Sequence, residues 1–345
     1  MTRTLRRPVA GALAVITVGL IWFVLQVFPI GGTGRQVIVT VHQGDSMTTI
    51  INEIHAKGVI NSPLAFRVET LLLGSPNVRP GAYEIAQNSS FASVRSILGG
   101  GPNVLVVQVI PGLTLHEVAL QIAADKGNAF ASAFLRAADT AAQQSPYRPD
   151  LSPPALPGMA ENVNALEGLI GVGDYVIAPS DTPAMVLARM TTAFTRETAL
   201  VGLSVSSRLD GLSAYQLVIA ASIVEREGYI ASNMPKVARV ILNRLQRGEG
   251  LQMDSTVKYP LGLDSGAVTV AMLQHTLSPY NTYKSAGLTP TPICTVSTTA
   301  LDAILHAPPG PWLYFVVVQK DGTEAFSSTY DGQKKNEQLA RSRGL

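Results

Sequence analysis

The stretch LVIAASIVEREGYIASN, residues 217–233, is apolar for most of its first eight positions and then carries Glu225, Arg226 and Glu227 in succession. Only 14% of the 345 residues are charged, against about 25% in an average globular chain. Two carboxylates at the end of an apolar run are therefore unusual for this chain, and they mark the first place to look for chemistry.

The surrounding residues predict a helix that ends at these carboxylates. Ser213 is a good N-cap residue, and Gln216, three positions later, completes a capping box. Gly228 is typical of the residue that follows a helix. Both glutamates then lie in the last turn, where the helix dipole disfavours an anion by ~0.3–1 kcal/mol. Such breaks of a local rule are expected at functional sites.

The spacing of the two glutamates predicts different surroundings for them. Residues two apart on a helix point about 160° away from each other, so we expect that they do not share one pocket. The apolar face of the helix directs Glu225 towards the packed side and Glu227 towards solvent. A carboxyl group held against apolar residues suits a general acid. The alternative is that both glutamates mark the solvated end of a helix.

The N-terminus predicts a membrane anchor. Residues 8–30 form a charge-free run after an arginine-rich segment, residues 1–7. A helix of ~20 apolar residues spans a bilayer, and positive flanks stay in the cytoplasm. We therefore expect a single-pass protein of the cell membrane, with the lipid bilayer as partner of residues 8–30 and the C-terminal part extracytoplasmic. A cleaved signal peptide is the alternative, and it places that part on the same side.

The rest of the chain predicts an α+β fold. Residues 37–100 have the order strand, helix, helix, strand, with Ser46 and Ser62 as N-caps. A similar strand and capped helix recur at 104–127, where Thr114 and Glu117 form a capping box. We interpret residues 128–160 as a surface excursion or linker.

Further elements are expected in the C-terminal half. Residues 166–194 predict a strand and then a helix capped near Ser180 or Asp181, and 235–246 predict another helix. Near the end, Asp321-Gly322 predicts a hairpin turn.

Composition and motifs argue against several functions. Net charge is +2, and no Lys/Arg run follows residue 7, so nucleic acid is not an expected partner. The chain has no phosphate-binding loop, no dinucleotide-binding glycine motif and no nucleophile elbow. Its five histidines are scattered without ligand spacing. We expect no metal and no cofactor, and Cys294 is expected to be a small buried hydrophobe.

Four motifs in series carry a family resemblance: ASIVEREG, VARVILNRL, LQMDSTVKY and SPYNTYKSAGLTPTPI. In this order they resemble the MltG-type (YceG-like) endolytic murein transglycosylases, and they lie in a catalytic core of about residues 213–330. The resemblance implies a LysM-like βααβ module at 37–100 and a mixed α/β catalytic domain at 104–345.

The resemblance also implies site residues. The family's catalytic glutamate falls on Glu225. Its substrate-binding positions fall on Gln252, Asp254, Thr256, Tyr259, Asn281, Thr282 and Tyr283.

Three departures from the family pattern are visible. LEGLIGVGDY at 166–175 stands where the family reads LEGFLFPDTY, which alters 170–174. TVS at 295–297 replaces NPG, and Gln333 stands where histidine is usual. We expect these positions to border the cleft and to affect substrate length preference and efficiency.

The implied activity is cleavage of the bond between N-acetylmuramic acid and N-acetylglucosamine within nascent peptidoglycan strands, leaving a 1,6-anhydro end and terminating glycan elongation. This is a lyase reaction, and peptidoglycan synthases are candidate partners. Two alternatives stay open. One is a muramidase-type hydrolase that uses Glu225 and Asp254, since hydrolysis of this bond usually needs two carboxylates. The other is a membrane-tethered scaffold that binds glycan without cutting it.

Overall fold

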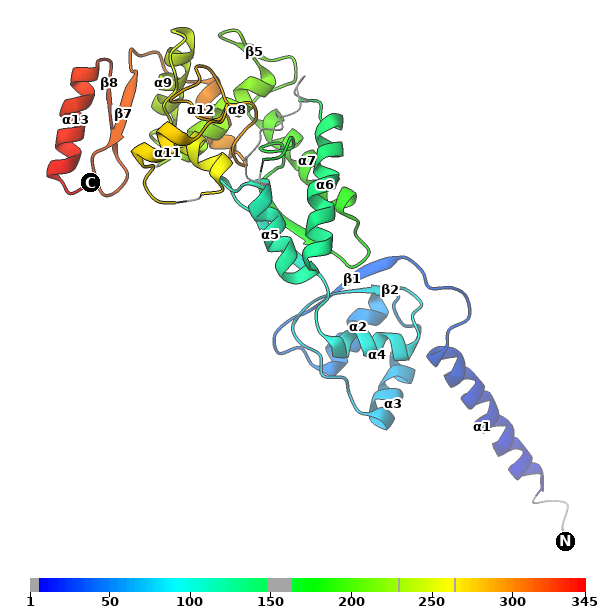
Figure 1. Ribbon diagram of the computed structural model, residues 1–345. Helices are drawn as coiled ribbons and strands as arrows, with labels where there is room; N and C mark the ends of the chain where they lie inside the picture. The colour runs from blue at the N-terminus through cyan, green and yellow to red at the C-terminus, as the bar shows by residue number, and fades with distance from the viewer. Residues whose placement is uncertain (1–5, 148–162, 229, 264) are drawn as a thin grey trace. The chain divides into compact units, whose positions relative to one another are not determined.

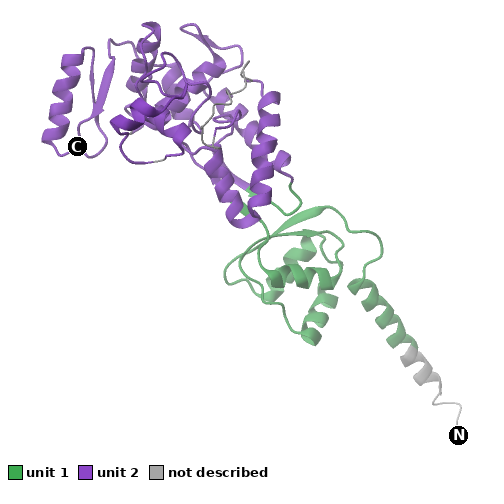
Figure 2. Ribbon diagram, viewed as in Figure 1, with its two compact units in different colours: residues 1–106, 176–181 green, residues 107–175, 182–345 purple. Residues whose placement is uncertain are grey.

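The computed structural model describes residues 6–147, 163–228, 230–263 and 265–345, with side chains from residue 14 on. The chain divides into two compact units, residues 1–106 with 176–181 and residues 107–175 with 182–345 (Figure 2). The predicted cytoplasmic segment, residues 1–7, and the predicted linker, residues 128–160, each fall partly outside the described residues.

Unit 1 combines a strand pair with short helices (Figure 1). In chain order its elements are α1 (Arg6–Val27), β1 (Gln36–Val41), α2 (Met47–Ala56), α3 (Pro63–Leu73), β2 (Gly81–Ala86) and α4 (Phe91–Gly100). Strands β1 and β2 pair in antiparallel register, with Val39 opposite Tyr83. The predicted strand, helix, helix, strand order of this region is confirmed.

Local caps start the helices of unit 1 as predicted. The Ser46 hydroxyl accepts from the Thr49 amide at 3.1 Å, and the Ser62 hydroxyl accepts from the Ala65 amide at 3.2 Å. The core behind the strand pair contains Phe66 and Phe91, whose rings meet edge to face with centroids 4.9 Å apart. Burial of these two rings gives the small unit much of its apolar core.

The predicted transmembrane helix is wrong. Helix α1 is described with its side chains over residues 14–27, which is 14 residues. Among the described residues, no helix is both long and apolar enough to cross a membrane. What remains of the predicted fold class is the mixed α/β architecture.

Unit 2 is mainly helical (Figure 1). Strands β3 (Leu105–Val109) and β4 (Gly173–Ile177) pair, and the boundary between the units falls within both. The helices up to the central one are α5 (Leu115–Lys126), α6 (Asn128–Gln144), α7 (Pro183–Leu200) and α8 (Ala214–Glu227), with the short strands β5 (Arg208–Leu209) and β6 (Leu212–Ser213) before α8.

The remaining elements follow α8 in the chain. They are α9 (Met234–Gln246), α10 (Asp254–Lys258), η1 (Tyr259–Leu261), α11 (Val270–His275), α12 (Thr298–Leu305), β7 (Tyr314–Val317), β8 (Glu324–Ser327) and α13 (Tyr330–Ser342). Helices α9 and α12 pack on α8, and the predicted hairpin is confirmed as β7 and β8 with Gly322 at positive φ in the turn.

The interpretation of residues 128–160 as a linker is wrong for its first half. Helix α6 occupies 128–144 and packs between α5 and α7. Alanine is the best helix former, and here the small side chains of Ala131, Ala138 and Ala142 are buried along one face with Phe134. The predicted cap of the following helix is also displaced, because the Thr182 hydroxyl accepts from the Met185 amide and caps α7.

Candidate active site

Helix α8 is buried on all sides rather than on one face. Apart from its first turn, every residue from Leu217 to Val224 is buried. A helix that is apolar all round belongs to the centre of a core. The capping box of Ser213 and Gln216 is present at its start, as predicted. Its polar last turn, by contrast, is partly exposed and meets open space.

That open space is a cleft of about 800 Å³. Its charged side chains come from α8, α10 and β8. The lining residues are Pro111, Gly112, Glu225, Arg226, Glu227, Gly228, Asp254, Ser255, Lys258, Ser265, Gly266, Phe315, Val316, Val317 and Glu324. The prediction that Glu225 and Glu227 do not share a pocket is thus wrong. The helix ends inside the cleft, so side chains that diverge around its axis still reach the same space.

Glu225 is held through one oxygen. Its Oε2 accepts from the Ser297 amide at 2.8 Å and from the Ser297 hydroxyl at 2.6 Å. The residue is partly buried. Its surroundings are not the wholly apolar pocket that the sequence predicts, because a polar residue from a segment 72 positions away reaches it.

Glu227 is the carboxylate whose surroundings favour the protonated form. Desolvation raises its pKa above the ordinary glutamate value, and the negative charge of Asp254 adds to this rise. The Ser255 amide donates to Glu227 Oε1 at 3.1 Å. The expected solvent-facing neighbour is therefore a group that can hold a proton inside the cleft.

Asp254 and Tyr283 form a pair at the cleft wall. The Tyr283 hydroxyl donates to Asp254 Oδ1 at 2.7 Å. Asp254 is the first residue of α10, where a carboxylate is favoured by the helix dipole, and α10 also supplies Lys258 to the cleft.

The other family-implied positions lie in the supporting wall. Thr256, Asn281 and Thr282 are buried, and their side chains bond inside the protein. Thr256 and Thr282 share a hydrogen bond of 2.8 Å between their hydroxyls. The Asn281 amide donates to two backbone carbonyls at 3.0 Å each. We find these side chains in hydrogen bonds that hold the loop 276–285 against α10.

Gln252 is exposed and has a positive φ of 55°. Its Oε1 accepts from the guanidinium of Arg244 at 3.3 Å, and Arg244 also donates to the carbonyls of Gly250 and Leu251. This strained turn is therefore fixed by one buried cation. Gln252 is not one of the described residues that line the cleft.

Tyr259 points into the core, towards Glu167. Its hydroxyl donates to Glu167 Oε2 at 3.1 Å, and the Leu115 amide donates to both carboxylate oxygens at 3.0 and 3.2 Å. Glu167 is fully buried, and desolvation raises its pKa to about 8 against these hydrogen bonds. Gly168, at φ 70°, leaves room for Pro292, which a Cβ would approach within 2.3 Å.

The three departures from the family pattern lie in different places. Ser297 contacts Glu225 directly. Gln333 lies in α13, not in a loop, and donates to the carbonyl of Phe315 at 3.1 Å behind the cleft wall. Residues 170–174 are not among the described residues that line the cleft.

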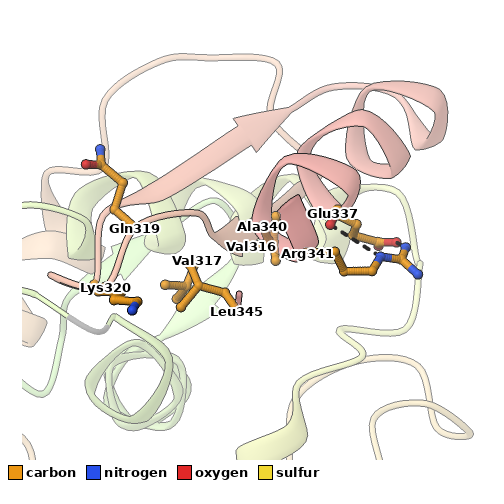
Figure 3. Close-up of a pocket in the computed structure, with 9 residues that line it drawn as sticks. Val316, Val317, Gln319, Lys320, Glu337, Ala340, Arg341 and Leu345 are labelled. Carbon is orange, nitrogen blue, oxygen red and sulfur yellow. Dashed lines mark hydrogen bonds and ion pairs between the residues drawn. The ribbon is translucent and has the colours of Figure 1, made fainter. Parts of the chain in front are cut away.

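A second cavity, of about 680 Å³, lies between the hairpin and α13 (Figure 3). Val316, Val317, Ala340 and Leu345 line it, and the Glu337–Arg341 ion pair of 3.4 Å lies beside them (Figure 3). Its lining is mainly apolar, and its carboxylate, Glu337, is paired with Arg341. The acidic cleft at the end of α8 is therefore the better reaction site.

Sequence reasoning missed several residues that line this cleft, among them Ser255, Lys258 and Glu324. It named 295–297 as a departure but did not predict that Ser297 contacts Glu225. One signal was available, because Ser297 precedes an apolar run and reads as a helix N-cap. The others come from short elements without a distinctive pattern.

Comparison with known proteins decides the family. Residues 39–339, well over half of the chain, match the YceG-like family. This chain belongs to the YceG-like family. It is similar to the endolytic murein transglycosylase of Bacillus subtilis (strain 168), with 26% identity over 304 residues, which cover 86% of this chain and 82% of the relative.

Two further relatives complete the comparison. The endolytic murein transglycosylase of Streptococcus pneumoniae (strain ATCC BAA-255 / R6) is 25% identical over 321 residues, and the match covers 88% of this chain but 58% of that longer relative. A 2.6 Å crystal structure of a YceG-like protein from Listeria monocytogenes shares the fold, with a TM-score of 0.57 and 24% identity. The match covers 88% of this chain and 99% of that one.

Proposed function

We propose that this YceG-like protein is an endolytic murein transglycosylase, a lyase that cuts within peptidoglycan glycan strands. Two of its relatives carry that name. The observation that carries the proposal is the position of Glu225. Its carboxylate lies in the last turn of the buried helix α8 and lines an open cleft of about 800 Å³. A rigid helix end holds an acid against a substrate more precisely than a loop does.

Glu225 acts first as an acid and then as a base. Its proton passes to the glycosidic oxygen as the bond from C1 of N-acetylmuramic acid to that oxygen breaks. The N-acetyl group of the same sugar stabilises the positive charge that develops at C1. The carboxylate then takes the proton of the C6 hydroxyl, and the C6 oxygen attacks C1. The product is a 1,6-anhydro end, no water is consumed, and Glu225 recovers its proton.

The other cleft residues assist this step. Lys258 and Arg226 supply positive charge to an otherwise acidic cleft, and Phe315 offers an apolar face to a sugar ring. Asp254 and Tyr283 offer polar groups to sugar hydroxyls. Gln252, Thr256, Tyr259, Asn281 and Thr282 contribute by holding the shape of the wall. No metal or cofactor enters this mechanism.

The substrate places the protein outside the cytoplasm, where glycan strands are assembled. On this proposal, unit 1 is a LysM-like module that binds glycan, and peptidoglycan synthases supply the nascent strands. Cutting such strands terminates their elongation.

A muramidase-type hydrolase is the second candidate, because Asp254 lines the same cleft as Glu225. The two reactions leave different ends. A hydrolase adds water and leaves a reducing sugar, whereas the transglycosylase leaves an anhydro sugar.

A digest of un-crosslinked glycan strands tests the proposal. The full chain and its Glu225→Gln variant are incubated with strands, and products are read by mass spectrometry. We expect internal cuts that end in anhydro-muramic acid, and their loss in the variant. Reducing ends would replace the proposal with the hydrolase. Strands that are bound and left intact by the wild type would favour a glycan-binding scaffold instead.

A further inference from the structure

Ser297 has two roles at the start of α12. As N-cap, its hydroxyl oxygen accepts from the Ala300 amide at 3.0 Å. The same hydroxyl donates its proton to Glu225 Oε2 at 2.6 Å, and the Ser297 amide donates to that oxygen at 2.8 Å. A hydroxyl has one proton to donate, and the Ala300 amide occupies a lone pair, so the proton is directed at the carboxylate.

Both donors converge on one carboxylate oxygen. No hydrogen bond from a described residue reaches Oε1 of Glu225, while the residue lines the cleft. A protonated carboxyl whose Oε2 accepts two hydrogen bonds keeps its own proton on Oε1. We propose that Ser297 is a positioning residue that fixes the Glu225 carboxylate and directs its acid proton to Oε1, an inference that rests on the proposed function.

The segment that carries Ser297 is tied to the helix that carries Glu225. The Ile293 amide donates to the Ser222 hydroxyl at 3.0 Å, and Ser222 lies one turn before Glu225 on α8. On its other side, the Thr295 amide and hydroxyl donate to the carbonyls of Leu113 and Ile110 at 2.7 and 2.8 Å. These hydrogen bonds hold the segment of Ser297 on both sides, and one of them ties it to α8. The distance between Ser297 and Glu225 is therefore fixed by the surrounding structure.

Several charged or titratable groups also face this carboxylate. Arg226, Glu227, Asp254, Lys258 and Glu324 share its cleft, and the Cys294 thiol lies behind it. They stay in place when the Ser297 hydroxyl is removed. A donor to a carboxylate favours the ionised form, so its loss shifts the titration of the cleft acid to higher pH.

Glycine at position 297 isolates the hydroxyl. Ser297→Gly keeps the backbone donor, and glycine ranks only slightly below serine as a helix N-cap. Ser297→Thr keeps the hydroxyl and serves as the rescue variant. Ser213→Ala is the matched control, because Ser213 caps the far end of α8 and does not line the cleft.

Two measurements on the full chain test the effect of these substitutions on Glu225. One is the pH profile of kcat/KM on un-crosslinked glycan strands. The other is a ¹³C NMR titration of the Glu225 carboxyl carbon, assigned by its loss in Glu225→Gln, which needs no turnover.

In Ser297→Gly we expect kcat/KM to fall about tenfold with KM nearly unchanged. The alkaline limb of the pH profile and the midpoint of the NMR titration both move up by about one pH unit in this variant. Ser297→Thr restores both, and Ser213→Ala changes neither. An NMR midpoint in Ser297→Gly equal to that of the wild type overturns the inference, even if the wild type cuts glycan. A shifted midpoint in a protein that cuts no glycan sustains the role of Ser297 and overturns the proposed function.

Discussion

Glu225 and Glu167 each directly follow an apolar residue in the sequence but lie in opposite surroundings. Glu225 is partly buried, opens onto a cleft, and accepts both donors of Ser297 on one oxygen. Glu167 is fully buried and accepts from the Leu115 amide and the Tyr259 hydroxyl. A carboxyl can deliver a proton only where a substrate can reach it, so access rather than residue type separates chemistry from structure here.

The largest expected effect separates the two glutamates by activity. Glu225→Gln should lower the rate of strand cutting by about a thousandfold, because a positioned acid contributes roughly 10²–10⁴ in rate. Glu167→Gln, measured at pH 6, should still cut. Product formation is followed by mass spectrometry. Equal losses in the two variants would mean that the comparison does not separate catalysis from stability.

The second prediction separates them by stability. The pKa of Glu167 is raised from 4.5 to about 8 by burial. Between these values the folded state holds a proton that the unfolded state has lost. The contribution of Glu167 is thus fully present below the lower value and is lost as pH rises to about 8, with a slope of up to ~1.4 kcal/mol per pH unit.

Urea unfolding between pH 5 and 8 measures this slope. The free energy of unfolding should fall more steeply with pH in the wild type than in Glu167→Gln. Asp125→Asn, an exposed carboxylate, serves as control and should follow the wild type. Parallel slopes in wild type and Glu167→Gln would show that Glu167 does not retain its proton in the folded protein.

A smaller effect is expected at Glu227. It lines the cleft as Glu225 does, and burial raises its pKa as it does that of Glu167. Its Oε1 accepts from the Ser255 amide. Glutamine keeps that acceptor and resembles the protonated acid. Glu227→Gln should therefore lower kcat/KM by less than about tenfold. The loss should shrink as pH falls, because the raised pKa of Glu227 lets the wild-type carboxyl take up a proton more readily than an ordinary glutamate. A loss as large as that of Glu225→Gln would make Glu227 the acid.

The smallest effect is expected at the start of α8, which carries Glu225 at its other end. Ser213→Ala removes the N-cap and should cost about 1 kcal/mol of unfolding free energy. The rate of strand cutting should not change, because the rest of the helix is held by burial. Urea unfolding and the strand digest together check this, and a change in rate would show that the cleft responds to the far end of the helix.

Much of the local structure is readable from sequence. The caps at Ser46, Ser62 and Ser213, the βααβ order of residues 36–86, and the hairpin around Gly322 all follow from patterns a few residues long. These features depend on backbone groups and side chains that are neighbours in the chain, so their physical causes are local.

Other predictions failed because they needed the third dimension. The alanine-rich segment 128–144 is a packed helix, since its small side chains fit between α5 and α7. The charge-free N-terminal run did not yield a helix that could span a bilayer among the described residues. The two glutamates share a cleft because α8 is buried all round, which spacing within one helix does not reveal.

By itself, the sequence determined that a capped, largely apolar helix ends at the carboxylates Glu225 and Glu227, and which family the motifs resemble. Only the tertiary structure decided which residues contact these glutamates. Ser297 reaches Glu225 from 72 positions away, and Ser255 reaches Glu227 from 28 positions away. The physical reason is one of range. Caps and turns are settled by bonds between near neighbours, whereas a cleft is made by segments that meet only after the core has packed.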